Sequence, residues 1–303
     1  MTQIAFIGLG HMGSGMAANL AKAGHDVRAF DLAPEALKHA AEAGCRAMGS
    51  AGEAVKHSEI VITMLPAGQH VREVYQADIL PNAMMHALLI DCSTIDVDTA
   101  REVALDAARL GFRAADAPVS GGTAAANAGS LTFMVGARDQ DFPEIEQALQ
   151  PMAKAVIHAG PSGSGQAAKI CNNMLLGVSM IAVSEAFVLA ERLNLDPQRF
   201  FDIASKASGQ CWSLTSYCPW PGPVPSAPSN RDYEPGFAIA MMLKDLKLAQ
   251  DAANAVQADT PLGGAAEALY AYLADHGYGG KDFSFILEML RGKLGQPPIV
   301  QAG

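Results

Sequence analysis

The chain has 303 residues, of which half are hydrophobic and 17% are charged, and its formal net charge is −10 at pH 7. This length predicts two domains with ample apolar material for packed cores. The negative charge argues against a nucleic-acid-binding protein, which normally carries a basic patch. An anionic substrate would have to be attracted by local positive groups. No run of 18 or more apolar residues is free of charge, so we expect no membrane span.

The five cysteines are scattered and form no C-x-x-C pair, which is typical of a protein from a reducing compartment. The sequence begins Met1-Thr-Gln and passes directly into an apolar run, with neither a signal peptide nor an Arg-rich transit segment. It contains no H-E-x-x-H motif and no Cys/His cluster with metal-ligand spacing. We therefore expect a cytoplasmic protein that binds no metal.

A glycine-rich turn follows the first predicted strand, Ile4 to Ile7, and leads into the helical pattern of Met16 and Leu20. In this strand–turn–helix context the first glycine makes the turn and the second lets the backbone approach a pyrophosphate. The third glycine permits close helix packing. The pyrophosphate then lies at the N-terminus of the helix. The residues predicted to form this cofactor-binding turn are Gly8, Leu9, Gly10, His11, Met12 and Gly13.

An acidic residue, Asp31, ends the second predicted strand, residues 25–30. Dinucleotide-binding folds place such a residue about 20 positions after the turn, on the ribose 2′-hydroxyl. A carboxylate at that point repels a 2′-phosphate, so the sequence predicts NAD rather than NADP as the cofactor.

Predicted strands continue to alternate with helical segments through the first half of the chain, at residues 60–64, 88–91, 112–115 and 131–135. This alternation predicts an α/β Rossmann-type fold with a parallel, doubly wound sheet. Ligands of such sheets bind beyond the carboxyl ends of the strands. The residues that follow these ends, and that we expect to line the binding cleft, are Leu65, Pro66, Thr94 and Ser120.

Ser120 is followed by Gly121 and Gly122. Two glycines after a serine can present consecutive backbone N–H groups and a hydroxyl to an anion. They can equally form a tight turn that binds nothing, and the sequence alone leaves both interpretations open.

A long helix is predicted from a Gly/Ser-rich loop at residues 160–165 to Leu193. Lys169 and Asn173 lie four apart in its early turns and therefore on one face. The N-terminal end of a helix disfavours a cation, which lowers the pKa of a lysine as proton transfer requires.

The second half of the chain has a helical pattern, with further helices predicted at residues 238–256, 261–274 and 284–291. We therefore expect two domains: a dinucleotide-binding domain at residues 1–163 and an all-helical substrate and oligomerisation domain at residues 164–303, joined by the long helix. Residues 208–236 are rich in Pro, Ser, Gly and aromatic side chains. We interpret this connection as a flap over the cleft or as a contact with a neighbouring subunit.

Four motifs together resemble the β-hydroxyacid dehydrogenase family: G-L-G-H-M-G, D-A-P-V-S-G-G, G-S-G-Q-A-A-K-I-C-N-N and M-L-K-D-L. The resemblance covers essentially the whole chain, with the motifs in the family's order and spacing. It implies a catalytic lysine at Lys169 and a substrate-orienting asparagine at Asn173. The substrate-binding residues that it implies are Ser120, Gly121, Gly122, Trp212 and Asp245, and Lys244 matches a lysine near the nicotinamide.

The implied reaction is the NAD-dependent oxidation of a small anionic hydroxy acid, for which we expect 3-hydroxyisobutyrate, converted to methylmalonate semialdehyde in valine catabolism. No histidine of a cleft motif is a better base, so Lys169 is predicted to accept the hydroxyl proton. Two alternatives remain open: reduction of a related semialdehyde, such as tartronate or succinic semialdehyde, and a non-catalytic nucleotide-binding scaffold. The resemblance also implies a homodimer or homotetramer.

Overall fold

In the computed structural model, which describes residues 1–294, the chain forms two compact units, Met1–Lys169 and Ile170–Gly303. The predicted domain boundary at residues 163/164 coincides with the start of a long helix, α9 (Ser164–Arg192), whereas the two units divide six residues further along, inside this helix.

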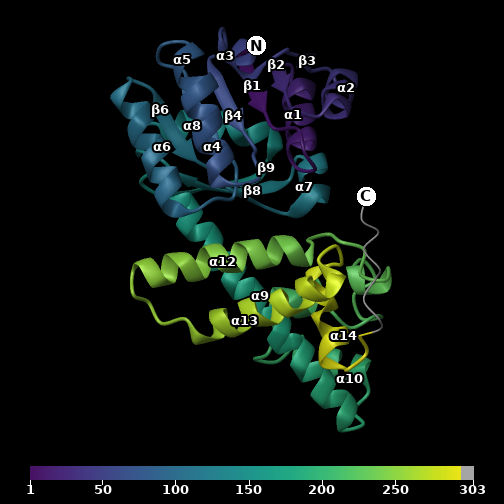
Figure 1. The fold of residues 1–303 in the computed structure, drawn as a ribbon. Helices are drawn as coiled ribbons and strands as arrows, with labels where there is room; N and C mark the ends of the chain where they lie inside the picture. Colours follow the sequence, from purple (N-terminus) through teal and green to yellow (C-terminus); the bar gives the residue numbers. More distant parts are fainter. Residues whose placement is uncertain (295–303) are drawn as a thin grey trace. The chain divides into compact units, whose positions relative to one another are not determined.

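The N-terminal unit is built on one sheet with the strand order β3-β2-β1-β4-β5-β6-β8-β7, and β9 pairs with β8 (Figure 1). The pairs from β3 to β6 are all parallel, as is the pair β8/β9. The strands are β1 (Gln3–Ile7), β2 (Asp26–Phe30), β3 (Arg46–Ala47), β4 (Ile60–Thr63), β5 (Leu88–Asp91), β6 (Arg113–Asp116), β7 (Val119–Ser120), β8 (Leu131–Gly136) and β9 (Ala153–Gly160). The predicted Rossmann-type fold class is confirmed.

The predicted parallel pairing does not extend to one edge of the sheet, where β8 runs antiparallel to both β6 and β7. The connection from β7 to β8 contains only the short helix α7 (Gly122–Ala128). Parallel neighbours need a crossover of a dozen or more residues, so this connection returns the chain in the opposite direction.

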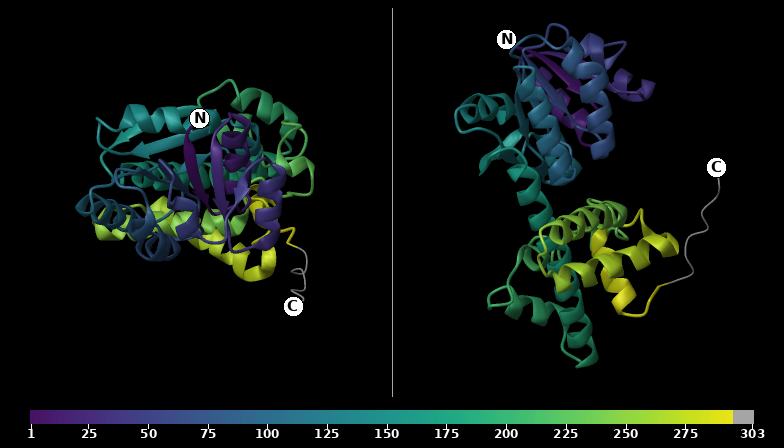
Figure 2. Two further views of the ribbon diagram at one scale, coloured as in Figure 1. Left: turned by 90° about the horizontal axis from the view of Figure 1, so that it is seen from above. Right: turned by 60° about the vertical axis from the view of Figure 1, so that its left-hand side comes forward.

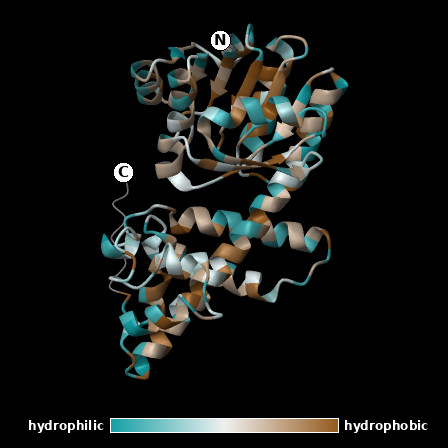
Figure 3. Cartoon of the chain, turned by 180° about the vertical axis from the view of Figure 1, so that it is seen from behind, coloured by the Kyte–Doolittle hydropathy of each residue, from teal (hydrophilic) through white to brown (hydrophobic). Residues whose placement is uncertain are grey.

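Helices cover both faces of the sheet, because side chains alternate along each strand (Figure 2). Ile4 and Phe6 of β1 belong to one buried cluster, and Ala5 and Ile7 belong to the other. The first cluster is covered by α1 (Gly13–Lys22), α2 (Pro34–Glu42), α7 and α8 (Phe142–Leu149). The second cluster is covered by α3 (Ala51–Val55), α4 (Gly68–Val74), the π-helical turn Tyr75–Ile79 and α6 (Val97–Arg109). The short helix α5 (Leu80–Asn82) follows the π-helical turn. The hydrophobic strands of this sheet are brown in Figure 3.

The C-terminal unit is helical, as the sequence predicts. Its core joins Met180 of α9 to Met242 of α12 and Tyr270 of α13, all fully buried. The helices are α10 (Pro197–Ala204), α11 (Trp212–Thr215), α12 (Ile239–Ala255), α13 (Pro261–Leu273) and α14 (Ile286–Leu290), together with a π-helical turn (Ala274–Tyr278) and a 3-10 turn (Phe283–Phe285).

Helix α9 is long and apolar enough to cross a membrane by length and composition, a criterion that the core helix of a soluble protein also meets. Met180 and Phe187 of α9 are fully buried in the two core clusters of the C-terminal unit. The apolar character of α9 is therefore used in packing within this fold.

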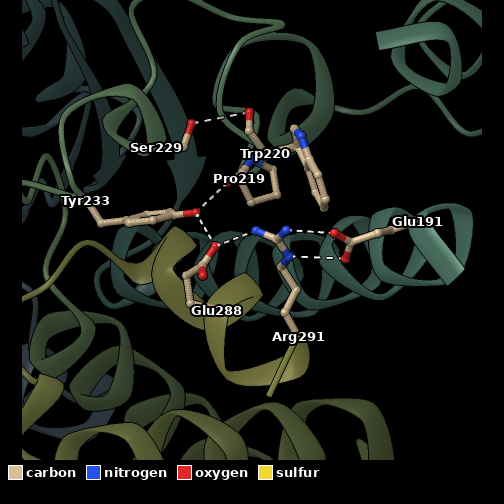
Figure 4. A network of polar contacts seen from close by, with 7 residues as sticks. All are labelled: Glu191, Pro219, Trp220, Ser229, Tyr233, Glu288 and Arg291. Atoms are coloured by element: carbon tan, nitrogen blue, oxygen red, sulfur yellow. Dashed lines mark hydrogen bonds and ion pairs between the residues drawn. The ribbon is translucent and has the colours of Figure 1, made fainter. Parts of the chain in front are cut away.

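The Pro-rich connection, residues 208–236, is more ordered than the sequence indicates, since it contains α11 and a 3-10 turn (Pro228–Asn230). Arg291 links this connection to α9 (Figure 4). Its guanidinium lies 4.3 Å from the ring centroid of Trp220 and pairs with Glu191 of α9 at 2.7 Å. Tyr233 donates a hydrogen bond to the carbonyl oxygen of Pro219 at 3.0 Å. Part of the connection thus packs against its own unit.

Candidate active site

The glycine turn at the end of β1 is shaped by close backbone contacts. Gly8 has a φ of +96°, a conformation that favours glycine, and a Cβ there would collide with the carbonyl oxygen of Met64. A Cβ on Gly13 would collide with the carbonyl oxygen of Gly8. Both glycines are therefore required by packing, as the dinucleotide-binding pattern predicts.

The middle of this turn fits a pyrophosphate. A Cβ on Gly10 would meet no atom within 4 Å, so open space lies in front of its backbone. Within residues 1–294, the amides of Gly10, His11 and Met12 donate no hydrogen bond. These N–H groups lie just before α1, where a helix N-terminus favours an anion. The side chain of Leu9 is buried in the core, and that of Met12 is partly buried against it.

Asp31 lies directly after β2, and both its carboxylate oxygens accept backbone hydrogen bonds. Leu9 N donates to Oδ2 at 2.6 Å, and Ala33 N donates to Oδ1 at 2.8 Å. The carboxylate is thus held beside the glycine turn, in the position that the sequence predicts for a contact with the ribose. The next side chain, Leu32, is 90% exposed.

The ends of β4 and β5 are joined by hydrogen bonds that the sequence did not reveal. Leu65 N donates to Ser93 Oγ at 2.8 Å, and Ser93 Oγ donates to Asp91 Oδ1 at 2.6 Å. Burial raises the pKa of the Asp91 carboxyl, although hydrogen bonds from Ser93 and Thr63 oppose this shift. The segments that carry Leu65 and Thr94 are therefore fixed to one another, while Pro66 is exposed.

The Ser120–Gly122 segment is the junction between β7 and α7. Gly121 and Gly122 have φ values of +135° and +69°, which side chains rarely adopt. Consecutive glycines in such conformations turn backbone N–H groups to one side. This geometry is compatible with an anion-binding nest and with a plain turn, so the role of Ser120 in substrate binding stays a prediction.

Lys169 lies in the second turn of α9 and is 7% exposed. Burial of a lysine is costly unless the charge is compensated or removed. The start of α9 is held by Asp116, the last residue of β6, whose oxygens accept hydrogen bonds from Gly163 N at 2.6 Å and Gln166 N at 2.8 Å. Burial raises the pKa of Asp116 to about 6, against the opposing effect of these two donors.

In the C-terminal unit, Asn173 of α9 is 2% exposed and donates a hydrogen bond to Asp245 Oδ2 at 2.5 Å. Lys244 Nζ lies 3.8 Å from Asp245 Oδ1. The structure therefore brings together Asn173, Lys244 and Asp245, which come from different motifs. Asp245 is 3% exposed and is placed to orient the Asn173 amide.

Trp212, the remaining predicted substrate-binding residue, begins α11 and is 51% exposed. Its ring stacks on that of Tyr217 with 4.9 Å between centroids. The Tyr217 hydroxyl donates to Asp282 Oδ2 at 2.8 Å, and the Gly236 and Phe237 amides donate to the same oxygen. The Trp212 indole therefore packs against Tyr217, and about half of its surface remains exposed to solvent.

No group of three or more His, Cys, Asp or Glu side chains that could hold a metal ion occurs among residues 1–294. The groups available for chemistry are the free backbone amides of the glycine turn, the Asp31 carboxylate beside them, and the buried Lys169, which shares a face of α9 with the Asn173 amide. These features define a nicotinamide-dependent oxidoreductase with a Rossmann-type cofactor domain.

Comparison with known proteins identifies the family. Residues 3–160 match the family described as the NAD binding domain of 6-phosphogluconate dehydrogenase. Residues 163–290 match the one described as NAD-binding of NADP-dependent 3-hydroxyisobutyrate dehydrogenase. The chain thus belongs to the 3-hydroxyisobutyrate dehydrogenase family, within the β-hydroxyacid dehydrogenases, and NAD is its cofactor.

Individual relatives span the whole chain. 3-Hydroxyisobutyrate dehydrogenase of Pseudomonas aeruginosa is 48% identical over 97% of this chain and 100% of its own. NAD-dependent L-serine dehydrogenase of the same organism is 44% identical over 98% of this chain and 100% of its own. The solved structure of Mycobacterium tuberculosis 3-hydroxyisobutyrate dehydrogenase with L-serine is 50% identical, covers 96% of this chain and 99% of its own, and superimposes with a TM-score of 0.93.

Proposed function

We propose that this chain oxidises 3-hydroxyisobutyrate to methylmalonate semialdehyde with NAD, as a step of valine catabolism. The observation that carries the proposal is the buried Lys169, four residues before Asn173 on one face of α9. The names of full-length relatives at 48–50% identity support the substrate. The position of the Asp31 carboxylate beside the glycine turn supports NAD over NADP.

In this mechanism the hydroxyl proton of the substrate passes to the Lys169 amine as the hydride leaves the alcohol carbon. A base within hydrogen-bond reach is needed because the two departures are coupled. The acceptor for the hydride would be supplied by a bound nicotinamide. The Asn173 amide, oriented by Asp245, donates to or accepts from the substrate, and the Ser120–Gly122 segment holds the substrate carboxylate.

The base is tested by Lys169→Met, which keeps the length and the apolar stem but removes the amine. We expect kcat to fall by about 10² or more, with the far-UV circular dichroism and NADH binding unchanged. Lys154→Met is the matched control, since Lys154 is exposed on β9. Near wild-type turnover of Lys169→Met at saturating substrate would show that another group accepts the proton.

The substrate is tested by measuring kcat/KM for a panel of hydroxy acids with NAD. A methyl group in an apolar pocket is worth about 10- to 200-fold, so 3-hydroxyisobutyrate should exceed 3-hydroxypropionate by at least about tenfold. Glycerate should be poor, and the methyl ester should fail because it lacks the carboxylate. A preference for glycerate would favour the tartronate semialdehyde alternative.

L-Serine is the second candidate substrate. A 44% identical relative is an NAD-dependent L-serine dehydrogenase, and the structure of the 50% identical relative is described with L-serine. L-Serine shares the carboxylate and the 3-hydroxyl with 3-hydroxyisobutyrate and replaces its methyl by an ammonium. It therefore belongs in the panel, and a higher kcat/KM for L-serine would reverse our assignment.

We also propose a cytoplasmic homodimer or homotetramer. All five cysteines lie in the described part of the chain and are free thiols, which suits a reducing compartment. Several large apolar side chains of α9 and α10 are more than half exposed, and burial in a subunit interface would stabilise them; they are Leu175, Leu189 and Ile203. Light scattering after size-exclusion chromatography would measure the assembly, and a monomer at micromolar concentration would contradict it.

A further inference from the structure

The first turn of α9 is pressed against the sheet with no room for side chains. A Cβ on Gly165 would collide with the carbonyl oxygen of Met134 and lie 2.7 Å from that of Asp116. A Cβ on Gly136 would collide with the Asp116 carboxylate and lie 2.8 Å from Gly165 N. The two glycines thus let the helix approach β6 and β8 closely enough for Asp116 to bond to it.

Asp116 holds this turn through both of its oxygens. Gly163 N and Gln166 N donate to them at 2.6 and 2.8 Å, and the side chain is nearly fully buried. A carboxylate at the N-terminus of a helix also interacts favourably with the helix dipole. The direction and position of the start of α9 are therefore fixed to the end of β6.

Gln166 extends the same attachment to a second strand end. Its Nε2 donates to the carbonyl oxygen of Ser93 at 2.7 Å, and its Oε1 accepts from Ile95 N at 3.1 Å. The side chain is fully buried. The two bonds bracket Thr94, for which we predict a cofactor contact.

Lys169 follows Gln166 by three residues of continuous helix, roughly 4.5 Å along the axis. A rigid helix transmits the position of its attached turn to a side chain this close. We propose that Asp116 and Gln166 are positioning residues that set where the Lys169 amine lies relative to the cofactor-binding segment around Thr94. This inference rests on the proposed role of Lys169 as the base.

Such a role has a direct effect on the rate, because catalysis depends steeply on the placement of the reacting groups. A misplacement of about 1 Å can reduce a rate by roughly 10². A purely structural role for the same network would lower the stability of the protein and leave the chemical step of the folded enzyme intact. The two roles therefore differ in whether a variant changes the kcat of the folded enzyme.

The test uses Gln166→Met, which keeps the volume and loses both hydrogen bonds, and Asp116→Asn, which keeps the shape and loses the charge. Asp141→Asn is the matched control, since Asp141 is equally buried in the same unit and pairs with Arg138 instead. The measurements are kcat, KM, NADH affinity by fluorescence, and the deuterium isotope effect on kcat with 3-hydroxyisobutyrate labelled at its alcohol carbon.

We expect both network variants to lower kcat by about tenfold or more and to raise the isotope effect, with NADH affinity within about threefold of wild type. In a Lys169→Met background, Gln166→Met should lower the residual rate by less than about twofold, because the residue that it positions is gone. Asp141→Asn should leave kcat and the isotope effect at wild-type values.

Two results would overturn the inference. One is a wild-type kcat and isotope effect in folded Gln166→Met and Asp116→Asn, with only the melting temperature lowered. The other is an equal loss of rate from Gln166→Met in the presence and absence of the lysine. Failure of the proposed function looks different, since Lys169→Met alone would then retain turnover.

Discussion

The cofactor preference can be changed at Asp31 with a magnitude that the structure bounds. Two backbone amides, Leu9 N and Ala33 N, hold the carboxylate in place, so it cannot rotate away from an added 2′-phosphate. Two unit charges about 4 Å apart interact by roughly 1 kcal/mol in water and 4 kcal/mol at a protein surface. The wild-type enzyme should therefore prefer NAD over NADP by about 5- to 1,000-fold in kcat/KM.

Asp31→Asn removes the charge and keeps the shape, and should lose most of this preference. Asp31→Ser combined with Leu32→Arg should reverse it, because residue 32 is exposed and an arginine there can reach a phosphate. Loss of a charge-assisted hydrogen bond to Leu9 N, worth about 1.5–3 kcal/mol, will weaken both cofactors. The informative quantity is thus the ratio of kcat/KM for NAD to that for NADP, measured by absorbance of the reduced cofactor.

Asp26→Asn is the control for this experiment, because Asp26 lies at the opposite end of β2 and pairs with Arg46 at 3.6 Å. It changes the net charge equally and should leave the ratio unchanged. A wild-type protein that already prefers NADP, or an unchanged ratio in Asp31→Asn, would refute the electrostatic reasoning.

Two further predictions concern stability. Arg291→Lys breaks the two-point pairing with Glu191 and the stacking on Trp220, so it should cost about 2 kcal/mol and lower the Tm by roughly 4–8 °C. Arg109→Lys, at an exposed helical pair, should change the Tm little, and equal shifts in the two variants would contradict this reasoning. Burial raises the pKa of Asp116 to about 6, so the folded protein binds a proton at this carboxyl more tightly than the unfolded chain does. The contribution of Asp116 to the free energy of unfolding is therefore greatest below about pH 4 and is lost as the pH rises to about 6. In urea unfolding, the free energy of unfolding of Asp116→Asn should vary with pH by up to about 3 kcal/mol less than that of the wild type. If the free energies of unfolding of the wild type and Asp116→Asn change in parallel with pH, the raised pKa of Asp116 is excluded.

The fold class was predictable because strong local patterns coincide with it. The apolar run before G-L-G-H-M-G is β1, and the long segment without proline is α9. The strand β9 (Ala153–Gly160) was missed because its longest apolar run is only three residues, 155–157, and none of its residues is fully buried. The antiparallel edge was missed because pairing direction depends on a short connection that periodicity does not report.

The candidate site was predictable only in part. Motif glycines and Lys169 are marked by local sequence, whereas Ser93, Asp116 and Gln166 act on partners 28 to 73 residues away. Spacing along the chain carries no sign of such pairings. Two of these residues belong to motifs, Asp116 as the first residue of D-A-P-V-S-G-G and Gln166 as the fourth residue of G-S-G-Q-A-A-K-I-C-N-N, but neither motif indicates the bonds that these side chains form.

The motifs therefore combine two kinds of residue with different physical roles. At three places in the chain, a residue proposed to contact ligand stands within a few positions of one whose polar groups are already bound by the protein: Thr94 beside Ser93, Ser120 after Asp116, and Lys169 after Gln166. Breaking one of these bonds in order to bind substrate would leave its protein partner unpaired, at a cost of about 1–3 kcal/mol. These framework residues are thus suited to hold the backbone in place, whereas their neighbours are the ones that we propose to contact the ligand. It follows that substrate specificity should change through residues such as Trp212, while Asp116 and Gln166 should affect turnover of every substrate alike.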